Sequence, residues 1–451
     1  MLTTQQKIGY AIGAYGLILF WSGASLFMLY YYTDVLLIKP ETAGLIFLLA
    51  MIWDGITDPV MGMIADRTRT RWGQYRPYLL FGAIPLAISY YLAFSIPELS
   101  AEALVTYVLI THLLFRTCFT VVYMPFTAFI AKLTSDSNER SSLTGYKVIF
   151  TQLATLSVSF FTLRLVDWFG GGNDATGFRM VALLSGVIGV LFIFACYRGT
   201  SQELLQDRKG QPPTYYSVSD LLLSFKANYP FVLVFLGTFL FVMSYAMILK
   251  GVVYYAKYYI GDKQMIGTIL SLVAAMALLV VPVCIKLTTI MSKRFIWIMS
   301  GLFTITGLVI VYLMPPTAIT GIVIGYIVLA IGTNAFLMNY YSMLADTVEY
   351  GEWKTGVRCE AGLFGFVAFA QKASVGVGAS LIGFLLGHFG FIANTIQTPE
   401  TLQGIKLSVT LIPCLGILAS MFLMIFYPIN AALHKKMSEE IAARNNDAGR
   451  R

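Results

Sequence analysis

The chain has 451 residues, of which 57% are hydrophobic and only 12% are charged, and its mean hydropathy is +0.74. Soluble domains usually carry about 25% charged residues, so this composition excludes an ordinary water-soluble protein. The net charge of +8 lies mainly in short segments between apolar runs, which favours membrane orientation over nucleic-acid binding. The five cysteines include no CxxC pair, and we expect neither a disulfide framework nor a metal site from them.

Apolar runs long enough to cross a bilayer as helices recur along the whole chain. We predict twelve such spans, at residues 8–32, 40–66, 77–96, 103–132, 145–168, 178–198, 229–260, 265–288, 294–314, 317–346, 361–389 and 403–427. Basic residues gather after the even-numbered spans, whereas the loop IPELSAEA carries no cation. The sequence therefore predicts an all-α polytopic membrane protein in the cell inner (plasma) membrane, with both termini cytoplasmic.

A polar stretch at 199–228 divides these spans into two groups of six. We therefore expect an N-terminal half at 1–198, a central cytoplasmic loop at 199–228, a C-terminal half at 229–430 and a cytoplasmic tail at 431–451. Two such halves suit a secondary transporter, which binds its substrate between them near the midplane. Another twelve-span membrane protein, including a membrane enzyme, would share this topology.

Two aspartates stand in the apolar run of the second span, within WDGITDPV. Asp54 and Asp58 are four residues apart and share one helix face, with the hydroxyl of Thr57 close by. Buried carboxylates are costly unless they are neutralised, and oxygen donors suit Na⁺ or a proton. The pattern predicts a coupling-ion site, and the alternative is a salt-bridged pair that only holds helices together.

Several basic residues also lie at membrane depth. Lys372, in the middle of the eleventh span, could pair with Asp54 or Asp58 when no cation is bound. Arg116 on the fourth span and Lys147 on the fifth could bind an anionic group of a substrate, or could instead snorkel or satisfy a neighbouring acid.

Charged residues at the predicted cytoplasmic ends of both halves suggest a gate that closes during half of the transport cycle. Surface pairs of this kind contribute only about 0–1 kcal/mol each, so a set of local pairs is the alternative. The candidates are Asp66, Arg67, Arg71, Asp346, Glu349, Arg358 and Glu360. The chain contains no GxSxG, HExxH or phosphate-binding loop, so we expect neither an enzyme nor an ATP-driven pump.

Four segments together carry a resemblance that covers nearly the whole chain: YYYTDV, WDGITDPVMGMIADRTRTRWGQYRPYLLFG, ADTVEYGEWKTGVRCEAG and FIANTIQTPETLQGI. They resemble the glycoside–pentoside–hexuronide:cation symporters of the major facilitator superfamily, which include the melibiose and glucuronide permeases. The resemblance implies the major facilitator fold. It implies that Asp54, Asp58, Thr57, Thr120 and Lys372 form or adjoin a Na⁺ or H⁺ site.

The resemblance also implies where the substrate binds. Ile18 and Tyr123 stand where the melibiose permease has sugar-binding aspartates, and Thr127 replaces a tryptophan. Lys147 falls where the glucuronide permease has an arginine. Phe364 is an aromatic candidate for stacking on a sugar ring. Without the two aspartates a melibiose-like galactoside is disfavoured, and with Arg116 and Lys147 nearby we expect an acidic glycoside, such as a hexuronide or glucuronide.

The sequence also allows other functions. The substrate could be a neutral pentoside or β-glycoside, and the same fold could move a lipid-like or drug-like solute. A membrane receptor that binds without translocating belongs to another class. We expect no cofactor beyond the coupling ion, no nucleic-acid partner, a small sugar as the ligand, the lipid bilayer as the environment and a monomer.

Overall fold

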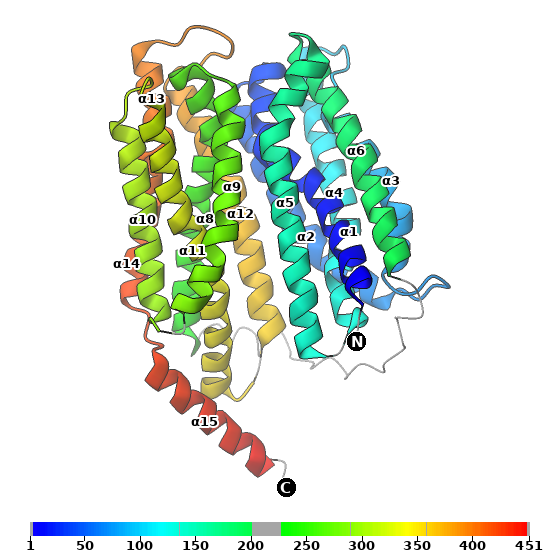
Figure 1. Ribbon diagram of the computed structural model, residues 1–451, viewed down its shortest axis with the longest axis vertical. Helices are drawn as coiled ribbons and strands as arrows, with labels where there is room; N and C mark the ends of the chain where they lie inside the picture. The colour runs from blue at the N-terminus through cyan, green and yellow to red at the C-terminus, as the bar shows by residue number, and fades with distance from the viewer. Residues whose placement is uncertain (1–2, 135, 201–226, 289, 358, 449–451) are drawn as a thin grey trace. The chain divides into compact units, whose positions relative to one another are not determined.

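A computed structural model describes residues 3–134, 136–200, 227–288, 290–357 and 359–448 (Figure 1). Most of the predicted loop at 199–228 and the predicted gate residue Arg358 lie outside these residues. Within them the chain is helical, and an isolated bridge joins Thr70 and Gly73. The helices are α1 Thr4–Tyr30, η1 Tyr31–Val35, α2 Pro40–Arg67, α3 Arg76–Ala93, α4 Ala101–Leu133, α5 Ser137–Gly170, α6 Asp174–Gly199, α8 Tyr229–Tyr254, η3 Tyr255–Ile260, α9 Gln264–Leu287, α10 Lys293–Leu313, α11 Ile319–Thr355, α12 Glu360–His388, α13 Pro399–Val409, α14 Leu411–Ile425 and α15 Ala431–Ala448.

Each predicted span corresponds to a helical stretch of the described chain, so the all-α prediction is confirmed. By length and composition, eleven of the described helical segments can cross a membrane. The third predicted span, α3, is 18 residues long and falls outside that group. Three spans differ clearly from the prediction: the fifth begins at Ser137 as part of α5, the tenth continues to Thr355 as part of α11, and the last consists of α13 followed by α14.

Side-chain caps explain why several helices begin where they do. Ser100, Asp136, Asn173 and Ser292 each accept a hydrogen bond from a backbone N–H in the first turn of the helix that follows. Such caps satisfy donors that the helix itself leaves unpaired.

Contacts between residues group the chain into two compact units. Unit 1 comprises Met1–Arg208 with Leu249–Ala275 and Ala379–Lys406, and unit 2 comprises the remaining segments. Unit 1 therefore joins the first six helical spans to one end of α8, α9 and α12. This grouping does not follow the predicted boundary at 199–228, because those helix ends make their contacts with the first half of the chain. The division into two halves stays a prediction.

Unit 1 packs α1 against α5 and α6, which lie on either side of it in Figure 1. A Cβ atom at Gly16 would lie 2.9 Å from the carbonyl oxygen of Gly189 on α6. Only a residue without a side chain therefore permits the observed approach of these two backbones, as in other membrane helix pairs. This tight packing fixes α1, whose far end carries side chains of the candidate site.

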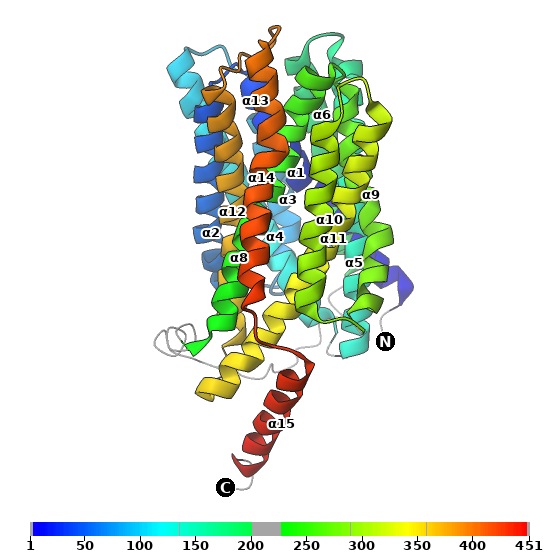
Figure 2. The same cartoon turned by 90° about the vertical axis from the view of Figure 1, so that its left-hand side faces the viewer.

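Unit 2 packs α10 against α11 and α14, and aromatic rings of α8, α10 and α11 meet in its core. The rings of Phe241 and Phe336 stack with centroids 3.7 Å apart, and Trp297 meets Phe336 edge-on. Figure 2 shows α15 beyond the ends of α11 and α14, where it contacts α11.

Candidate functional site

The two aspartates of α2 occupy different environments one helical turn apart. The Asp54 side chain is fully buried, whereas Asp58 is half-buried. Pro59 follows Asp58 inside the helix. A proline has no N–H, so it cannot donate the hydrogen bond that the carbonyl of Gly55 would receive in a regular helix. The turn between the aspartates therefore offers a backbone oxygen in addition to two carboxylates.

Two residues of α4 face these two aspartates in matched register. Arg116 Nη1 donates to Asp54 Oδ2 at 3.3 Å, and Thr120 Oγ1 donates to Asp58 Oδ1 at 2.8 Å. Arg116 and Thr120 are four residues apart, as are Asp54 and Asp58, so consecutive turns of α2 and α4 meet. The structure thus places Thr120 beside Asp58, and the part of Thr120 in a cation site stays a prediction.

Arg116 and Asp54 form a buried ion pair in which both side chains are 0% exposed. Removing one partner of such a pair typically costs about 3–5 kcal/mol, because the other is left as an uncompensated buried charge. The structure thus shows Arg116 as a basic partner of Asp54. Lys372, the partner suggested by the sequence, lies half-buried on α12 in unit 2, and its pairing with either aspartate stays a prediction.

A hydrogen-bonded chain continues from Arg116 towards α1. Arg116 Nε donates to His112 Nε2 at 3.2 Å, and His112 Nδ1 lies 3.1 Å from the hydroxyl of Tyr32. A guanidinium only donates, so Nε2 of His112 must accept and carries no proton. His112 is therefore neutral, and its Nδ1–H points to Tyr32. We call Tyr32, Asp54, Asp58, His112, Arg116 and Thr120 the mid-helix cluster.

Aromatic rings and a second cation surround this cluster. The Arg116 guanidinium carbon lies 4.8 Å from the ring centroid of Trp21 and 5.6 Å from that of Phe47. Lys250 Nζ lies 3.8 Å from the same Phe47 ring and donates to the carbonyl of Ser25. The sequence reasoning missed Lys250, although a single lysine inside the apolar run MILKGVV of the seventh span was a visible signal.

The remaining predicted substrate residues are not gathered by described contacts into one pocket. Tyr123 stacks on Phe119 with centroids 5.0 Å apart, and the Thr127 hydroxyl donates to a carbonyl of its own helix. Lys147 Nζ lies 5.7 Å from the Phe126 ring. The others are Ile18, buried on α1, and Phe364, half-buried on α12 in unit 2. The Thr57 hydroxyl of the predicted cation site donates to the carbonyl of Trp53. These roles stay predictions.

Four of the predicted gate residues have described partners inside their own units. In unit 1, the Tyr75 hydroxyl donates to Asp66 Oδ1 at 2.7 Å, and Arg71 lies over the ring of Trp72. Burial, and secondly this hydrogen bond, raise the pKa of Tyr75, so its hydroxyl remains a donor.

In unit 2, Lys293 Nζ lies 2.7 Å from Asp346 Oδ1, and His434 of α15 lies 3.0 Å from Glu349 Oε2. Arg67 is exposed at the end of α2, and Glu360 begins α12. A gate formed between the two sets stays a prediction.

A second polar set, absent from the sequence reasoning, joins the ends of α1 and α8 within unit 1. Asp34 is buried in the π-helical turn η1, and Lys257 and Tyr258 lie in the π-helical turn η3. Lys257 Nζ lies 2.8 Å from Asp34 Oδ1, and the Tyr258 hydroxyl donates to the same oxygen. Asn394 donates to the backbone carbonyl of Asp34 at 2.7 Å and accepts from Lys257 at 2.8 Å. We call these four residues the helix-end clasp.

A neighbouring bridge in unit 1 supports the clasp. Lys263 Nζ lies 2.8 Å from Asp167 Oδ1 and 2.8 Å from Asp174 Oδ1. Burial lowers the pKa of Lys263, but the hydrogen bonds to the two aspartates outweigh it, and the pKa lies above its ordinary value. Lys263 therefore stays charged at physiological pH and ties the start of α9 to α5 and α6.

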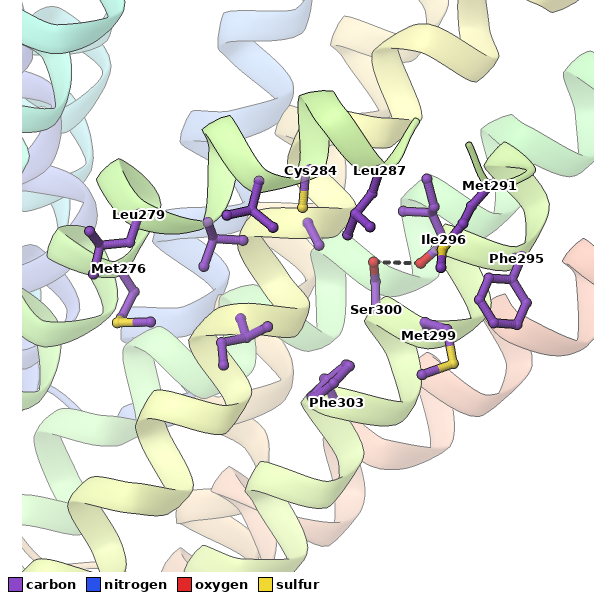
Figure 3. Close-up of a pocket in the computed structure, with 14 residues that line it drawn as sticks. Met276, Leu279, Cys284, Leu287, Met291, Phe295, Ile296, Met299, Ser300 and Phe303 are labelled. Atoms are coloured by element: carbon purple, nitrogen blue, oxygen red, sulfur yellow. Dashed lines mark hydrogen bonds between the residues drawn. The ribbon is translucent and has the colours of Figure 1, made fainter. Parts of the chain in front are cut away.

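Unit 2 contains an apolar cavity of about 430 Å³ between α9, α10 and α11 (Figure 3). Its one polar side chain, Ser300, donates its hydroxyl hydrogen to the carbonyl of Ile296 at 2.7 Å. Sugars are bound by several placed polar groups as well as by apolar surface. The cavity therefore lacks the donors and acceptors that a sugar needs, and the mid-helix cluster is the better candidate site.

Solved structures show the class of this fold. The chain is similar to a nucleoside transporter with a TM-score of 0.71, at 12% identity over 93% of this chain and 99% of that one. It is also similar to a bacterial homologue of the human lysosomal transporter Spinster, with a TM-score of 0.69, at 13% identity over 98% and 99% of the two chains. These neighbours have the major facilitator fold, and the predicted fold class is confirmed.

The chain belongs to the MFS/sugar transport protein family, whose pattern matches residues 9–431, and within it to the glycoside–pentoside–hexuronide branch. It is 30% identical to an isoprimeverose transporter of Lactiplantibacillus pentosus, over 97% of this chain and 91% of that protein. It is 26% identical to a glucuronide carrier protein homologue of Escherichia coli (strain K12), over 98% and 96% of the two chains. The protein is thus a multi-pass membrane protein and a sugar transporter.

Proposed function

We propose that the protein is a cation-coupled symporter that imports an acidic sugar or glycoside, of the hexuronide or glucuronide class, by alternating access. The observation that carries this proposal is the mid-helix cluster, in which two buried or half-buried carboxylates face an arginine and a hydroxyl. Ionisable residues inside a membrane helix are costly, and they generally serve ion or substrate pathways.

The oxygen atoms around Asp58 suit a small hard cation. Asp58 and Asp54 supply carboxylates, Thr120 supplies a hydroxyl, and the carbonyl of Gly55 is released from its regular helical partner by Pro59. Oxygen ligands of this kind bind Na⁺, and the same carboxylates accept a proton. Cation binding raises the affinity for sugar, and sugar raises the affinity for the cation by the same factor.

The charges around the cluster favour an acidic substrate. Arg116 and Lys250 are two basic side chains beside the aspartates, and Arg116 already forms an ion pair with Asp54. A coupling cation bound at this pair adds positive charge in a low-dielectric environment. The carboxylate of an acidic sugar offsets that added charge. The similarity to a glucuronide carrier homologue supports the same substrate class.

A neutral glycoside is the second candidate, and one observation favours it. The relative at 30% identity is named as a transporter of isoprimeverose. In this alternative the hydroxyl groups of the sugar, rather than a carboxylate, bind near the cluster, and Arg116 keeps its partner Asp54 throughout the cycle.

Uptake into proteoliposomes tests the proposal with a matched pair of substrates. Methyl glucuronide and methyl glucoside differ only in a carboxylate against a hydroxymethyl group. We expect the wild type to accumulate the glucuronide above its external concentration when Na⁺ or H⁺ flows inward, and the glucoside to accumulate much less. Asp58→Asn and Asp54→Cys abolish accumulation, whereas Glu98→Gln in an exposed loop does not. Uphill accumulation by both site variants would refute the carboxylate site, and binding without accumulation would indicate a receptor.

A further inference from the structure

We propose that Arg116 is a tethered competitor of the coupling cation: its guanidinium occupies the cationic position at Asp54 and must withdraw before a cation can bind there. The inference rests on the proposed function, because it concerns the same cation site. It assigns to Arg116 control of cation affinity, and to His112 and Tyr32 the positioning of Arg116.

Arg116 and Asp54 form fewer hydrogen bonds with each other than an arginine–carboxylate pair can form. Arginine and carboxylate commonly pair through two short parallel hydrogen bonds. Here one contact of 3.3 Å joins Arg116 Nη1 to Asp54 Oδ2, and Arg116 Nη2 is buried with no hydrogen-bond partner among the described residues. A buried donor without a partner is unfavourable, so Asp54 does not hold this guanidinium as firmly as a two-bond pair would.

The Nε side of the same guanidinium is held by a second hydrogen bond. Arg116 Nε donates to His112 Nε2 at 3.2 Å, and both residues lie on α4. His112 is in turn held by the hydroxyl of Tyr32 at 3.1 Å and by the ring of Phe47, with centroids 5.3 Å apart. The Nε–H is thus held by His112, and the guanidinium can leave Asp54 only by turning as a rigid plane about this contact.

The ring of Trp21 offers a position for the Arg116 guanidinium when it leaves Asp54. The ring of Trp21 lies 4.8 Å from the guanidinium carbon on the α1 side, and a cation is attracted to such a face. A guanidinium that turns towards Trp21 no longer donates to Oδ2 of Asp54, and this oxygen can then contact a cation bound beside Asp58 and Thr120. A purely structural pair would instead be expected to hold the guanidinium through both terminal nitrogens.

The consequence is a prediction about affinity. With Arg116 present, a cation must displace a covalently attached rival whose local concentration is very high. Without it, Asp54 and Asp58 both attract the incoming ion. Arg116→Gln therefore strengthens Na⁺ binding, or creates Na⁺ binding where the wild type shows none because the arginine excludes the metal ion.

The test is a titration of the purified full-length chain with NaCl at constant ionic strength, with choline chloride as the replacement salt. Na⁺ binding is followed by thermal stability and by tryptophan fluorescence, since Trp21 and Trp53 lie at the site. We expect Arg116→Gln to lower the half-saturating Na⁺ concentration by about tenfold or more, as removal of a close charge partner commonly does. Arg116→Lys has a shorter reach and a single donor group, and should lie between the two.

Two further variants keep the outcome decisive. Asp54→Asn with Arg116→Gln removes both charges, which is far less disruptive than removing one, and this variant should lose the strengthened response. If Arg116→Gln does not fold, the lysine variant decides. A Na⁺ response that is unchanged, weaker or absent in the arginine variants overturns the inference. Uphill sugar accumulation by the wild type, measured separately, shows whether the proposed function itself stands.

Discussion

The mid-helix cluster and the helix-end clasp both place an aspartate of the first half beside a buried or half-buried cation, yet they are built differently. In the cluster, Asp54 meets Arg116 through one contact of 3.3 Å, and the guanidinium retains a buried nitrogen without a partner in the described chain. In the clasp, Asp34 accepts a hydrogen bond from Lys257 at 2.8 Å and another from the hydroxyl of Tyr258. The loose contact is suited to exchange with an ion, whereas the saturated contact is suited to hold two helix ends together.

The two sets also differ in the chain segments that they join. The cluster lies wholly within η1, α2 and α4 of the first predicted half. The clasp joins η1 to η3 and to the loop that carries Asn394, which come from the second predicted half. If the two predicted halves move against each other, the clasp must open during the cycle, whereas the cluster lies within one half.

Asp58→Asn should have the largest effect, because it removes the carboxylate nearest to the proposed ion. We expect uphill accumulation of sugar to fall by about a hundredfold or more, while downhill exchange across the membrane remains measurable; charged groups that couple in this way contribute several kcal/mol. Radiolabelled sugar uptake with and without an ion gradient measures both. Equal loss of exchange and accumulation would mean that Asp58 serves folding rather than coupling.

Lys257→Met should break the clasp and leave Asp34 buried without its cation. We expect the free energy of unfolding to drop by about 3 kcal/mol, as for other half-removed buried pairs. Adding Asp34→Asn should recover most of that loss, because both charges are then gone. Thermal unfolding of the single and double variants in detergent gives the comparison. A double variant no more stable than the single variant would contradict the clasp as an ion pair.

Lys263→Gln should have a smaller effect, since Lys263 and its two aspartates are partly exposed to solvent. We expect about 1 kcal/mol or less of lost stability. The pKa of Lys263 is raised in the folded protein, so its contribution is full below the unfolded value of about 10.4 and is lost as pH rises through the higher folded value. The stability difference between wild type and variant should thus be constant near neutral pH and vanish only in strong alkali.

Ala335→Leu should have the least effect on transport, because Ala335 lines the apolar cavity rather than either polar set. The added methyl groups fill part of a volume of about 430 Å³ and should leave the KM for sugar unchanged. Initial uptake rates over a range of sugar concentrations provide the check. A several-fold rise in KM would assign the cavity to the substrate path and would favour the lipid-like or drug-like solute over a sugar.

Much of the architecture could be predicted from the sequence, because a membrane span is a local property. Length and apolarity identify the spans, and four-residue spacing places Asp54 and Asp58 on one face of α2. The contact of Arg116 with Asp54 could not be predicted in this way. Spacing indicates which residues share a helix face but not which neighbouring helix meets that face, and the pairing of Lys372 with Asp54 or Asp58 stays a prediction.

The clasp was missed for a related reason. Asp34 and Lys257 sit at the ends of apolar spans among tyrosines, where a charge is ordinarily an interfacial residue. Their π-helical turns and the positive φ of 57° at Asn394 depend on tertiary contacts that no local pattern encodes. Lys250 is different, because a lone lysine deep in an apolar run could be recognised from the sequence. Its contacts with Ser25 and Phe47 could be found only in the structure.

The most direct test of coupling at the mid-helix cluster is whether sugar movement itself carries the ion. Proteoliposomes without any ion gradient are given an inward gradient of sugar, and the entry of Na⁺ and of H⁺ is recorded. The account predicts that one of these ions enters with the sugar in the wild type, and that Asp58→Asn lets sugar enter without it. Sugar entry with no accompanying ion in the wild type would contradict the account.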